Sequence, residues 1–232
     1  MKEVRDVNLM DKTYDDYYAS EYSFRENWFG PIAKKYILPK YYKLLAAFVG
    51  DQENITMLEI GAGDGEVTDH IRDKQPTWEI TPTEPVESGV EALKKHGYES
   101  ATIVDAVSLP FPDNSFDYVI CFDVMHHVTG PAQMATEMMR VAKKGVFMVE
   151  ANRQAIARRL LEKTQIYKNA GEFSYYPKEY RAFFNLPSRA SITIHPFQFI
   201  PPKLSKISLK LAIFISELVE RLPLLRCGSV LV

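Results

Sequence analysis

Two periods of apolar residues alternate along the middle of the chain. Five short segments, apolar or β-branched and bounded by turn residues, have the pattern of β-strands. They are residues 54–60, 77–83, 100–105, 116–122 and 145–150. Between the last two, Met134, Met138 and Val141 recur at helical spacing and form an apolar stripe. Apolar strands that alternate with helices predict a doubly wound α/β fold, with a mostly parallel sheet covered on both faces.

The two flanks are expected to extend this sheet and to close over it. The N-terminal flank is dense in aromatic residues and predicts one or two helices before the first strand. A strand-like stretch at 190–200, a helix at 203–222 and an apolar stretch at 227–232 would complete a seven-stranded sheet. We therefore predict a single domain over residues 1–232. Its parts are an N-terminal helical lid (1–50), a ligand-binding core (51–152) and a substrate-cap segment that completes the sheet (153–232).

Charge and cysteine content argue against several functions. The 232-residue chain has a formal net charge of −2, which provides no general attraction for nucleic acid or an anionic membrane. The N-terminus lacks the apolar core of a signal peptide, and no uncharged run reaches membrane-spanning length. We therefore expect a cytoplasmic protein without stable membrane insertion. Cys121 and Cys227 show no CxxC spacing, so neither a disulfide framework nor a zinc site is indicated.

A glycine-rich stretch, "LEIGAGDGE", follows the first predicted strand. Glycines at a strand-to-helix turn allow a ligand to approach the backbone closely. A dinucleotide fold would have GxGxxG, whereas Gly61, Gly63 and Gly65 form GxGxG. Glu59 and Asp64 add negative charge where a diphosphate would otherwise lie. This pattern disfavours a diphosphate and with it a nicotinamide-dependent oxidoreductase.

Glu84 ends the second predicted strand, about the distance beyond the glycines at which an acidic residue accepts ribose hydroxyls. The expected ligand therefore has a ribose but no phosphate, and tolerates negative surroundings. A cationic nucleoside has these properties, and S-adenosylmethionine (SAM) is one.

The same residues resemble the class I SAM-dependent methyltransferases, and most closely their type-11 small-molecule branch. The resemblance covers roughly residues 54–152, through "LEIGAGDG", "TEP", "DAVSLPFPDNSFDYVICFDVMHHV" and "MMRVAKKGVFMVE". The resemblance implies a Rossmann-like methyltransferase fold. It also implies that the methionine and ribose are lined by Glu59, Gly61, Ala62, Gly63 and Gly65, with Glu59 acting through water or the amino group, and that Glu84 binds the ribose. Pro85 and Val86 would pack on the adenine, Asp105, followed by Ala106, would accept a hydrogen bond from the adenine amino group, and Phe122 and Asp123 would lie beside the methionine moiety.

Few catalytic side chains are obligatory for methyl transfer, because the sulfonium donor is already activated. A carbon or oxygen acceptor usually needs a base, and "VMHHV" places His126 and His127 just past the fourth strand. Either could be the base or could orient the acceptor. No third strong ligand with suitable spacing follows them, so no metal is expected. The [DNS]PP[YFW] signature of nucleic-acid amino-group methylases is replaced here by "CFDVMHHV", which argues against base methylation.

Both flanks leave alternatives open. Tyr14, Tyr17, Tyr18 and Tyr22 could close over SAM, as the resemblance suggests, or could form the apolar face of a helix. The aromatic residues Tyr175, Tyr176, Tyr180, Phe183 and Phe184 could line an acceptor pocket or cover the fifth strand. Arginines at 153, 158 and 159 could bind an acidic acceptor or form a solvated helix face. The apolar helix at 203–222 is buried or interfacial, and we expect a monomer or homodimer.

The sequence therefore predicts a SAM-dependent methyltransferase that acts on a small molecule by in-line displacement and releases S-adenosylhomocysteine. Flank composition favours an apolar or aromatic acceptor. A non-catalytic SAM- or nucleoside-binding regulatory module is the alternative, and a nicotinamide-dependent oxidoreductase is a weaker one.

Overall fold

The computed structural model describes residues 33–163 and 174–185, together with 210–211, 213–214, 218 and 230–231. Within these residues the strands form one six-stranded sheet in the order β3-β2-β1-β4-β5-β6. The bounds are β1 Thr56–Ile60, β2 Glu79–Glu84, β3 Thr102–Ile103, β4 Phe116–Phe122, β5 Ala142–Glu150 and β6 Val230–Leu231. Strands β1 to β5 pair in parallel, and β6 pairs antiparallel to β5.

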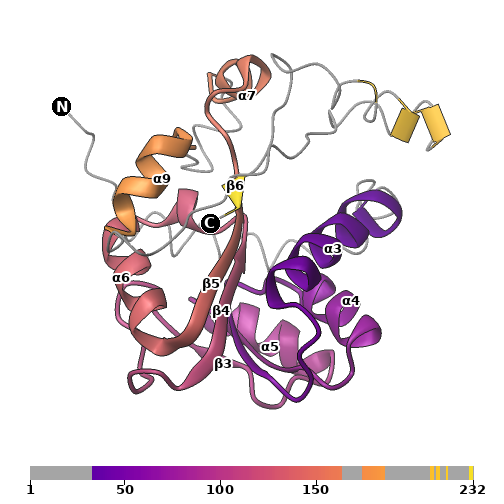
Figure 1. Cartoon of the computed structure of the whole chain (residues 1–232), viewed down its shortest axis with the longest axis vertical. Helices are drawn as coiled ribbons and strands as arrows, with labels where there is room; N and C mark the ends of the chain where they lie inside the picture. Colours follow the sequence, from indigo (N-terminus) through magenta and orange to yellow (C-terminus); the bar gives the residue numbers. More distant parts are fainter. Residues whose placement is uncertain are drawn as a thin grey trace.

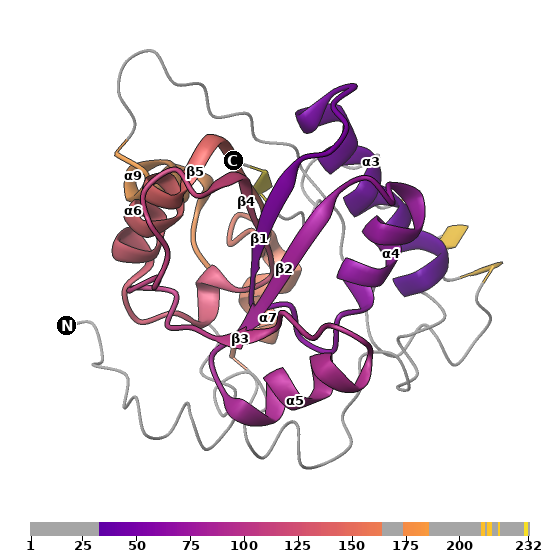
Figure 2. The same ribbon diagram turned by 90° about the horizontal axis from the view of Figure 1, so that it is seen from below.

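Helices cover the sheet on both sides. Their bounds are η1 Ala33–Ile37, α3 Leu38–Val49, α4 Glu66–Lys74, α5 Glu87–Lys95, η2 Met125–His127, α6 Pro131–Val141, α7 Ile156–Leu161 and α9 Pro177–Phe183. Helices α3 and α4 lie on one side of the sheet, and α6 and α9 lie on the other (Figures 1 and 2). The doubly wound α/β fold predicted from the sequence is confirmed.

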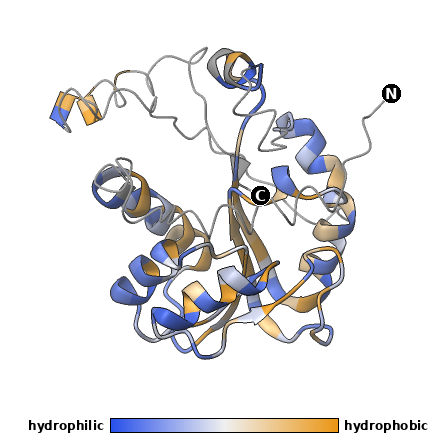
Figure 3. Cartoon of the chain, turned by 180° about the vertical axis from the view of Figure 1, so that it is seen from behind, coloured by the Kyte–Doolittle hydropathy of each residue, from blue (hydrophilic) through white to orange (hydrophobic). Residues whose placement is uncertain are grey.

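Alternation along the central strands produces the two cores. On β4, Tyr118, Ile120 and Phe122 belong to the cluster that includes buried residues of α3 and α4. Val119 and Cys121 belong instead to the cluster that includes buried residues of α6 and α9. Successive strand residues face opposite sides of a sheet, so a strand covered on both sides must be apolar at every position. Figure 3 shows the resulting apolar sheet between helices whose outer sides are largely hydrophilic.

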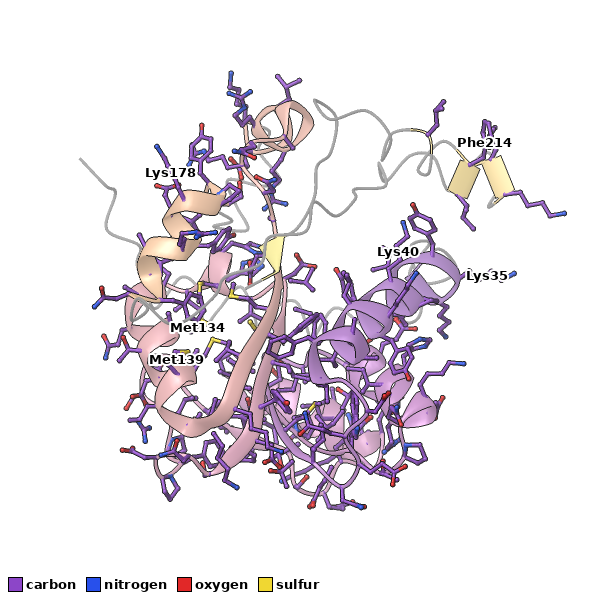
Figure 4. All side chains as sticks on the ribbon, viewed as in Figure 1. Lys35, Lys40, Met134, Met139, Lys178 and Phe214 are labelled. Carbon is purple, nitrogen blue, oxygen red and sulfur yellow. The ribbon has the colours of Figure 1, made fainter. Side chains whose placement is uncertain are left out.

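Methionines fill the tight space between α6 and the sheet. Met134 and Met138 are fully buried, whereas Met139 is partly exposed on the same helix (Figure 4). The apolar stripe predicted from helical spacing is therefore the face of α6 that packs on the sheet.

The predicted strands match β1 to β5 in order, with different ends. The third strand shrinks to two residues, Thr102–Ile103, and the fifth begins at Ala142, directly after α6. The predicted closing stretch contains β6. The strand expected at 190–200 lies outside the described residues. Of the N-terminal flank expected to form one or two helices before the first strand, the described part contains η1 and α3. Among the described residues, no helix combines the length and apolar character needed to cross a membrane.

Candidate functional site

The glycine loop joins β1 to α4 at the carboxyl edge of the sheet. Gly61, Gly63 and Gly65 have φ values of 68°, 60° and 75°, in the left-handed region that favours glycine. The N–H of Ala62 donates to the carbonyl of Thr83 at 3.0 Å, which ties the loop to β2. The loop thus has a fixed shape, with backbone conformations that other residues adopt only at a cost.

Two of these glycines have different reasons to lack a side chain. A Cβ at Gly61 would lie 2.6 Å from Cγ2 of Val124, so this glycine is required for packing against the turn after β4. A Cβ at Gly63 would meet no atom of the described residues within 4 Å. The backbone of Gly63 therefore borders open space, as the approach of a ligand would require.

Glu84, the last residue of β2, lies next to this open backbone. Its side chain is buried, and its Oε1 accepts a hydrogen bond from the N–H of Gly63. Gly89 of α5 leaves room for it, because a Cβ there would lie 3.0 Å from Cγ of Glu84. The carboxylate is thus fixed beside the glycine loop. The role of Gly89 was not predicted, although a glycine within a helical pattern was a signal of close packing.

Glu59 lies behind the loop and has a strongly perturbed acidity. It is 1% exposed, and its Oε2 accepts a hydrogen bond from Oγ1 of Thr68 at 2.6 Å. Burial raises the pKa of Glu59 to about 8; the nearby charges of Glu84 and Asp69 also raise it, and the Thr68 hydrogen bond opposes them. Glu59 is therefore largely protonated at neutral pH.

This raised pKa predicts a pH-dependent stability. The pKa of Glu59 is 4.5 in the unfolded chain and about 8 in the folded chain. Between these pH values the folded chain binds more protons at Glu59 than the unfolded chain does, so the contribution of Glu59 to the free energy of unfolding falls as the pH rises. Glu59→Gln, which cannot ionise, should gain stability relative to the natural protein from pH 5 to pH 8, by on the order of a few kcal/mol. Urea unfolding at several pH values measures this gain. The exposed Glu79→Gln on β2 is the control, and equal pH dependence in both variants would contradict a raised pKa at Glu59.

At the neighbouring strand end, Asp105 follows β3. Its side chain is exposed, and its Oδ1 accepts a hydrogen bond from the N–H of Val107 at 3.0 Å. The N–H of Val104 donates to the carbonyl of Glu84 at 3.0 Å, which keeps this turn beside the end of β2. Ala106 in this turn is partly buried; beyond Glu84, Pro85 is exposed and Val86 is buried.

The end of β4 contacts α3. The ring of Tyr41 stacks on Phe122 with centroids 5.0 Å apart, and its hydroxyl donates to Oδ2 of Asp123 at 2.8 Å. Burial, followed by the Asp123 charge and hydrogen bond, raises the pKa of Tyr41 well above its ordinary value, so its hydroxyl remains a donor. Asp123 has a φ of 57°, which is uncommon for a residue other than glycine. Tyr41 was not predicted here, since 82 positions separate it from its partner.

The two histidines occupy the short helix η2 and differ in their surroundings. His126 is buried, and its Nδ1 lies 2.7 Å from Oε2 of Glu150 at the end of β5. His127 is partly exposed, and its ring centroid lies 4.2 Å from that of His126. Glu150 was not predicted as a site residue, although an acid that closes the apolar strand "GVFMVE" at the ligand-bearing edge was a usable signal. In the described part of the chain, no three His, Cys, Asp or Glu side chains are grouped as metal ligands.

Residues 58–149, which contain the glycine loop and the carboxyl ends of β1 to β4, match the family model described as "Methyltransferase domain", of type 11. Residues 58–149 are a methyltransferase domain of the class I, SAM-dependent family. The identification agrees with the resemblance drawn from the sequence motifs.

Curated relatives cover part of this chain. An uncharacterised methyltransferase of Schizosaccharomyces pombe is 27% identical over 151 residues, 60% of this chain and 49% of its own length. The UbiE protein of Burkholderia mallei, named a ubiquinone/menaquinone biosynthesis C-methyltransferase, is 35% identical over 109 residues, 43% of this chain and 45% of its own. The chain thus spans about half the length of these relatives.

Among solved structures, the plantazolicin methyltransferase BpumL, in complex with S-adenosylhomocysteine, is similar in fold. It has a TM-score of 0.62 at 14% identity, with 90% of this chain and 89% of that chain covered. Identity at this level supports the shared fold alone.

The segment after the methyltransferase domain is organised around Glu162. Its Oε1 lies 3.2 Å from Nε of Arg158 and accepts hydrogen bonds from the N–H and hydroxyl of Ser174. Its Oε2 lies 4.0 Å from Nε of Arg153. Two of the three arginines considered from the sequence therefore contact this acid, and Arg159 is exposed.

The aromatic residues of α9 favour one of the two alternatives drawn from the sequence. Tyr180 is fully buried, its hydroxyl donates to the carbonyl of Ala151 at 3.0 Å, and it belongs to the core cluster with residues of β5 and α6. Tyr175 packs edge-on against it with centroids 5.5 Å apart. These rings cover the fifth strand.

The candidate lid residues Tyr14 and Tyr18 lie outside the described residues.

Proposed function

We propose that this protein transfers the methyl group of SAM to a small-molecule acceptor by in-line displacement and releases S-adenosylhomocysteine. The observation that carries the proposal is Glu84, fixed beside the open backbone of Gly63 at the carboxyl edge of the sheet. A carboxylate can accept hydrogen bonds from both ribose hydroxyls. The methyltransferase domain at residues 58–149 supplies the class of reaction.

The charges around the loop support a cationic nucleoside. Glu84 lies beside Gly63, Asp64 and Glu66 occupy the turn into α4, and Asp69 follows in α4, whereas Glu59 is largely protonated. This acidic environment favours a sulfonium and an ammonium group and disfavours a diphosphate. In our proposal Glu59 and the glycine loop contact the methionine and ribose, and Asp105 contacts the adenine amino group. Phe122 and Asp123 then lie beside the methionine.

An apolar, ring-containing acceptor is the proposed substrate class. One partial relative is named as a ubiquinone/menaquinone biosynthesis C-methyltransferase, and aromatic residues are concentrated in both flanks of this chain. Such flanks can bury an apolar ring and exclude water from the transfer. We further propose that the protein acts in the cytoplasm as a monomer or homodimer, without nucleic acid as a partner.

Calorimetric titration of the purified chain with SAM, S-adenosylhomocysteine and NAD tests the cofactor assignment. We expect both sulfur nucleosides to bind and NAD to give no heat of binding. Binding of NAD alone would refute the proposal in favour of an oxidoreductase. Binding of SAM without release of S-adenosylhomocysteine in a broad acceptor screen would favour the regulatory module.

A further inference from the structure

A buried glutamate and a buried histidine form a pair at the carboxyl ends of β5 and β4. Glu150 has no exposed surface, and His126 is 3% exposed. The two oxygens of Glu150 make separate contacts. Oε1 accepts hydrogen bonds from the N–H groups of Val124 at 2.9 Å and Met125 at 2.6 Å, and Oε2 lies 2.7 Å from Nδ1 of His126.

This arrangement determines which ring nitrogen of His126 carries the proton. An ionised carboxylate can only accept hydrogen bonds, so the Nδ1 that faces Oε2 must be the donor. In the neutral imidazole the other nitrogen, Nε2, is then the unprotonated and basic one. The tautomer thus follows from the identity of residue 150.

Other charged or titratable groups surround the pair. Electrostatic interactions connect Glu150 or His126 to several elements, and Arg158 acts on the same neighbourhood through Asp123 and Tyr180. The groups are Cys121 of β4, Asp123 directly after β4, Tyr41 of α3, His127 of η2, Arg158 of α7 and Tyr180 of α9. Negative carboxylates at positions 123 and 150 both favour a positive charge on His126 once it has accepted a proton.

We propose that Glu150 is a positioning residue that keeps Nε2 of His126 basic, so that His126 removes the proton from an acceptor with an acidic O–H or C–H group. The inference rests on the proposed methyl transfer and specifies its acceptor class. The acceptor loses its proton to Nε2, its electron pair forms the new bond to the methyl carbon, and the electrons of the breaking C–S bond remain on sulfur. The products are methylated acceptor, S-adenosylhomocysteine and imidazolium, which later releases the proton to water.

Burial keeps bulk water away from the base, which strengthens the interaction between imidazolium and Glu150.

Glu150→Gln separates positioning from a purely structural role. Glutamine has the same shape, and its Oε1 can still accept from Val124 and Met125. Its NH₂ group would face His126, so Nδ1 would have to become the acceptor and the ring proton would move to Nε2. Glu179→Gln is the matched control, because Glu179 also accepts a backbone N–H, that of Tyr176 in α9, at 2.8 Å.

Nitrogen-15 NMR of the histidine rings is the first readout and needs no acceptor. We expect the Nδ1–H tautomer for neutral His126 in the natural protein and in Glu179→Gln, and the Nε2–H tautomer in Glu150→Gln. His126→Gln assigns the signal. An Nε2–H tautomer in the natural protein, or no change in Glu150→Gln, would overturn the inference.

Turnover of a phenolic probe is the second readout. With methyl-labelled SAM and 1,4-dihydroxynaphthalene, Glu150→Gln should lower kcat by about 100-fold or more while the Kd for SAM stays within about threefold and the melting temperature is retained. Turnover by Glu150→Gln at the natural rate, or no turnover of the phenol by the natural protein, would overturn the base role. Failure to bind SAM would instead refute the proposed function itself.

Discussion

Replacing Glu84 by alanine is expected to weaken SAM binding by at least about 100-fold. Each hydrogen bond to a charged group contributes about 1.5–3 kcal/mol, and Glu84 is proposed to accept one from each ribose hydroxyl. About 1.4 kcal/mol corresponds to a tenfold change in affinity, so losing two such bonds exceeds a factor of 100. The N–H of Gly63 also loses its acceptor. Calorimetric titration with SAM measures the effect.

Glu91→Ala is the matched control for this experiment. Glu91 is an exposed glutamate on α5, and its removal changes the net charge equally without touching the loop. Its SAM affinity should equal that of the natural protein. If Glu84→Ala retains its circular dichroism spectrum and binds SAM normally, the ribose does not lie at the end of β2.

Alanine at Gly61 and alanine at Gly63 should damage different properties. Gly61→Ala places a methyl group against Val124 in a left-handed backbone conformation, and we expect a loss of about 2–4 kcal/mol in the free energy of unfolding. Gly63→Ala has the same backbone strain but no clash with the part of the chain that the structure describes. It should cost only about 1 kcal/mol of stability and should lower SAM affinity by about 10- to 100-fold, because its methyl group enters the space proposed for the ligand.

Gly97→Ala is the control that measures how much stability is lost through backbone strain alone. Gly97 has a φ of 87°, and a Cβ there meets no described atom within 4 Å, but Gly97 follows α5 and is far along the chain from the loop. It should lose stability as Gly63→Ala does and keep full SAM affinity. Urea unfolding and calorimetry of the three variants measure both properties. Equal SAM affinity in Gly63→Ala and Gly97→Ala would exclude the backbone of Gly63 from the ligand site.

The apolar helix predicted at 203–222 is only partly described. Phe214, 60% exposed, and Leu218, 51% exposed, are among its described residues (Figure 4). Ile213 packs against the core cluster that includes α3. Ile213 therefore contacts the domain, and whether the predicted helix is buried or interfacial stays a prediction.

Local sequence signals predicted most of the fold. Each of β1 to β5 lies in or overlaps a short run rich in apolar or β-branched residues, and such runs are recognisable without tertiary information. The end of β3 was less predictable, because only Thr102 and Ile103 pair with β2. Glu84 was predicted as the ribose-binding acid from the number of residues between it and the glycines, because a strand-loop-helix-strand unit has a nearly constant length.

The partners of these residues could not be predicted in the same way. Tyr41 meets Asp123, and Glu150 meets Val124, Met125 and His126, only after α3, β4 and β5 have packed together. Nothing near Tyr41 or Glu150 in the sequence specifies which distant residue each will contact. Their roles therefore depend on the register of neighbouring strands.

The sequence by itself determined the order of strands and helices, the glycine loop and the acidic residue that follows it, because these depend on short-range periodicity and backbone conformation. Tertiary structure alone decided that Gly61 makes room for Val124 while Gly63 borders open space. It also decided that burial raises the pKa of Glu59 and that Glu150 lies within hydrogen-bond distance of His126. The physical reason is that burial, desolvation and hydrogen-bond direction depend on atoms brought together by parallel pairing of β1 with β4 and of β4 with β5.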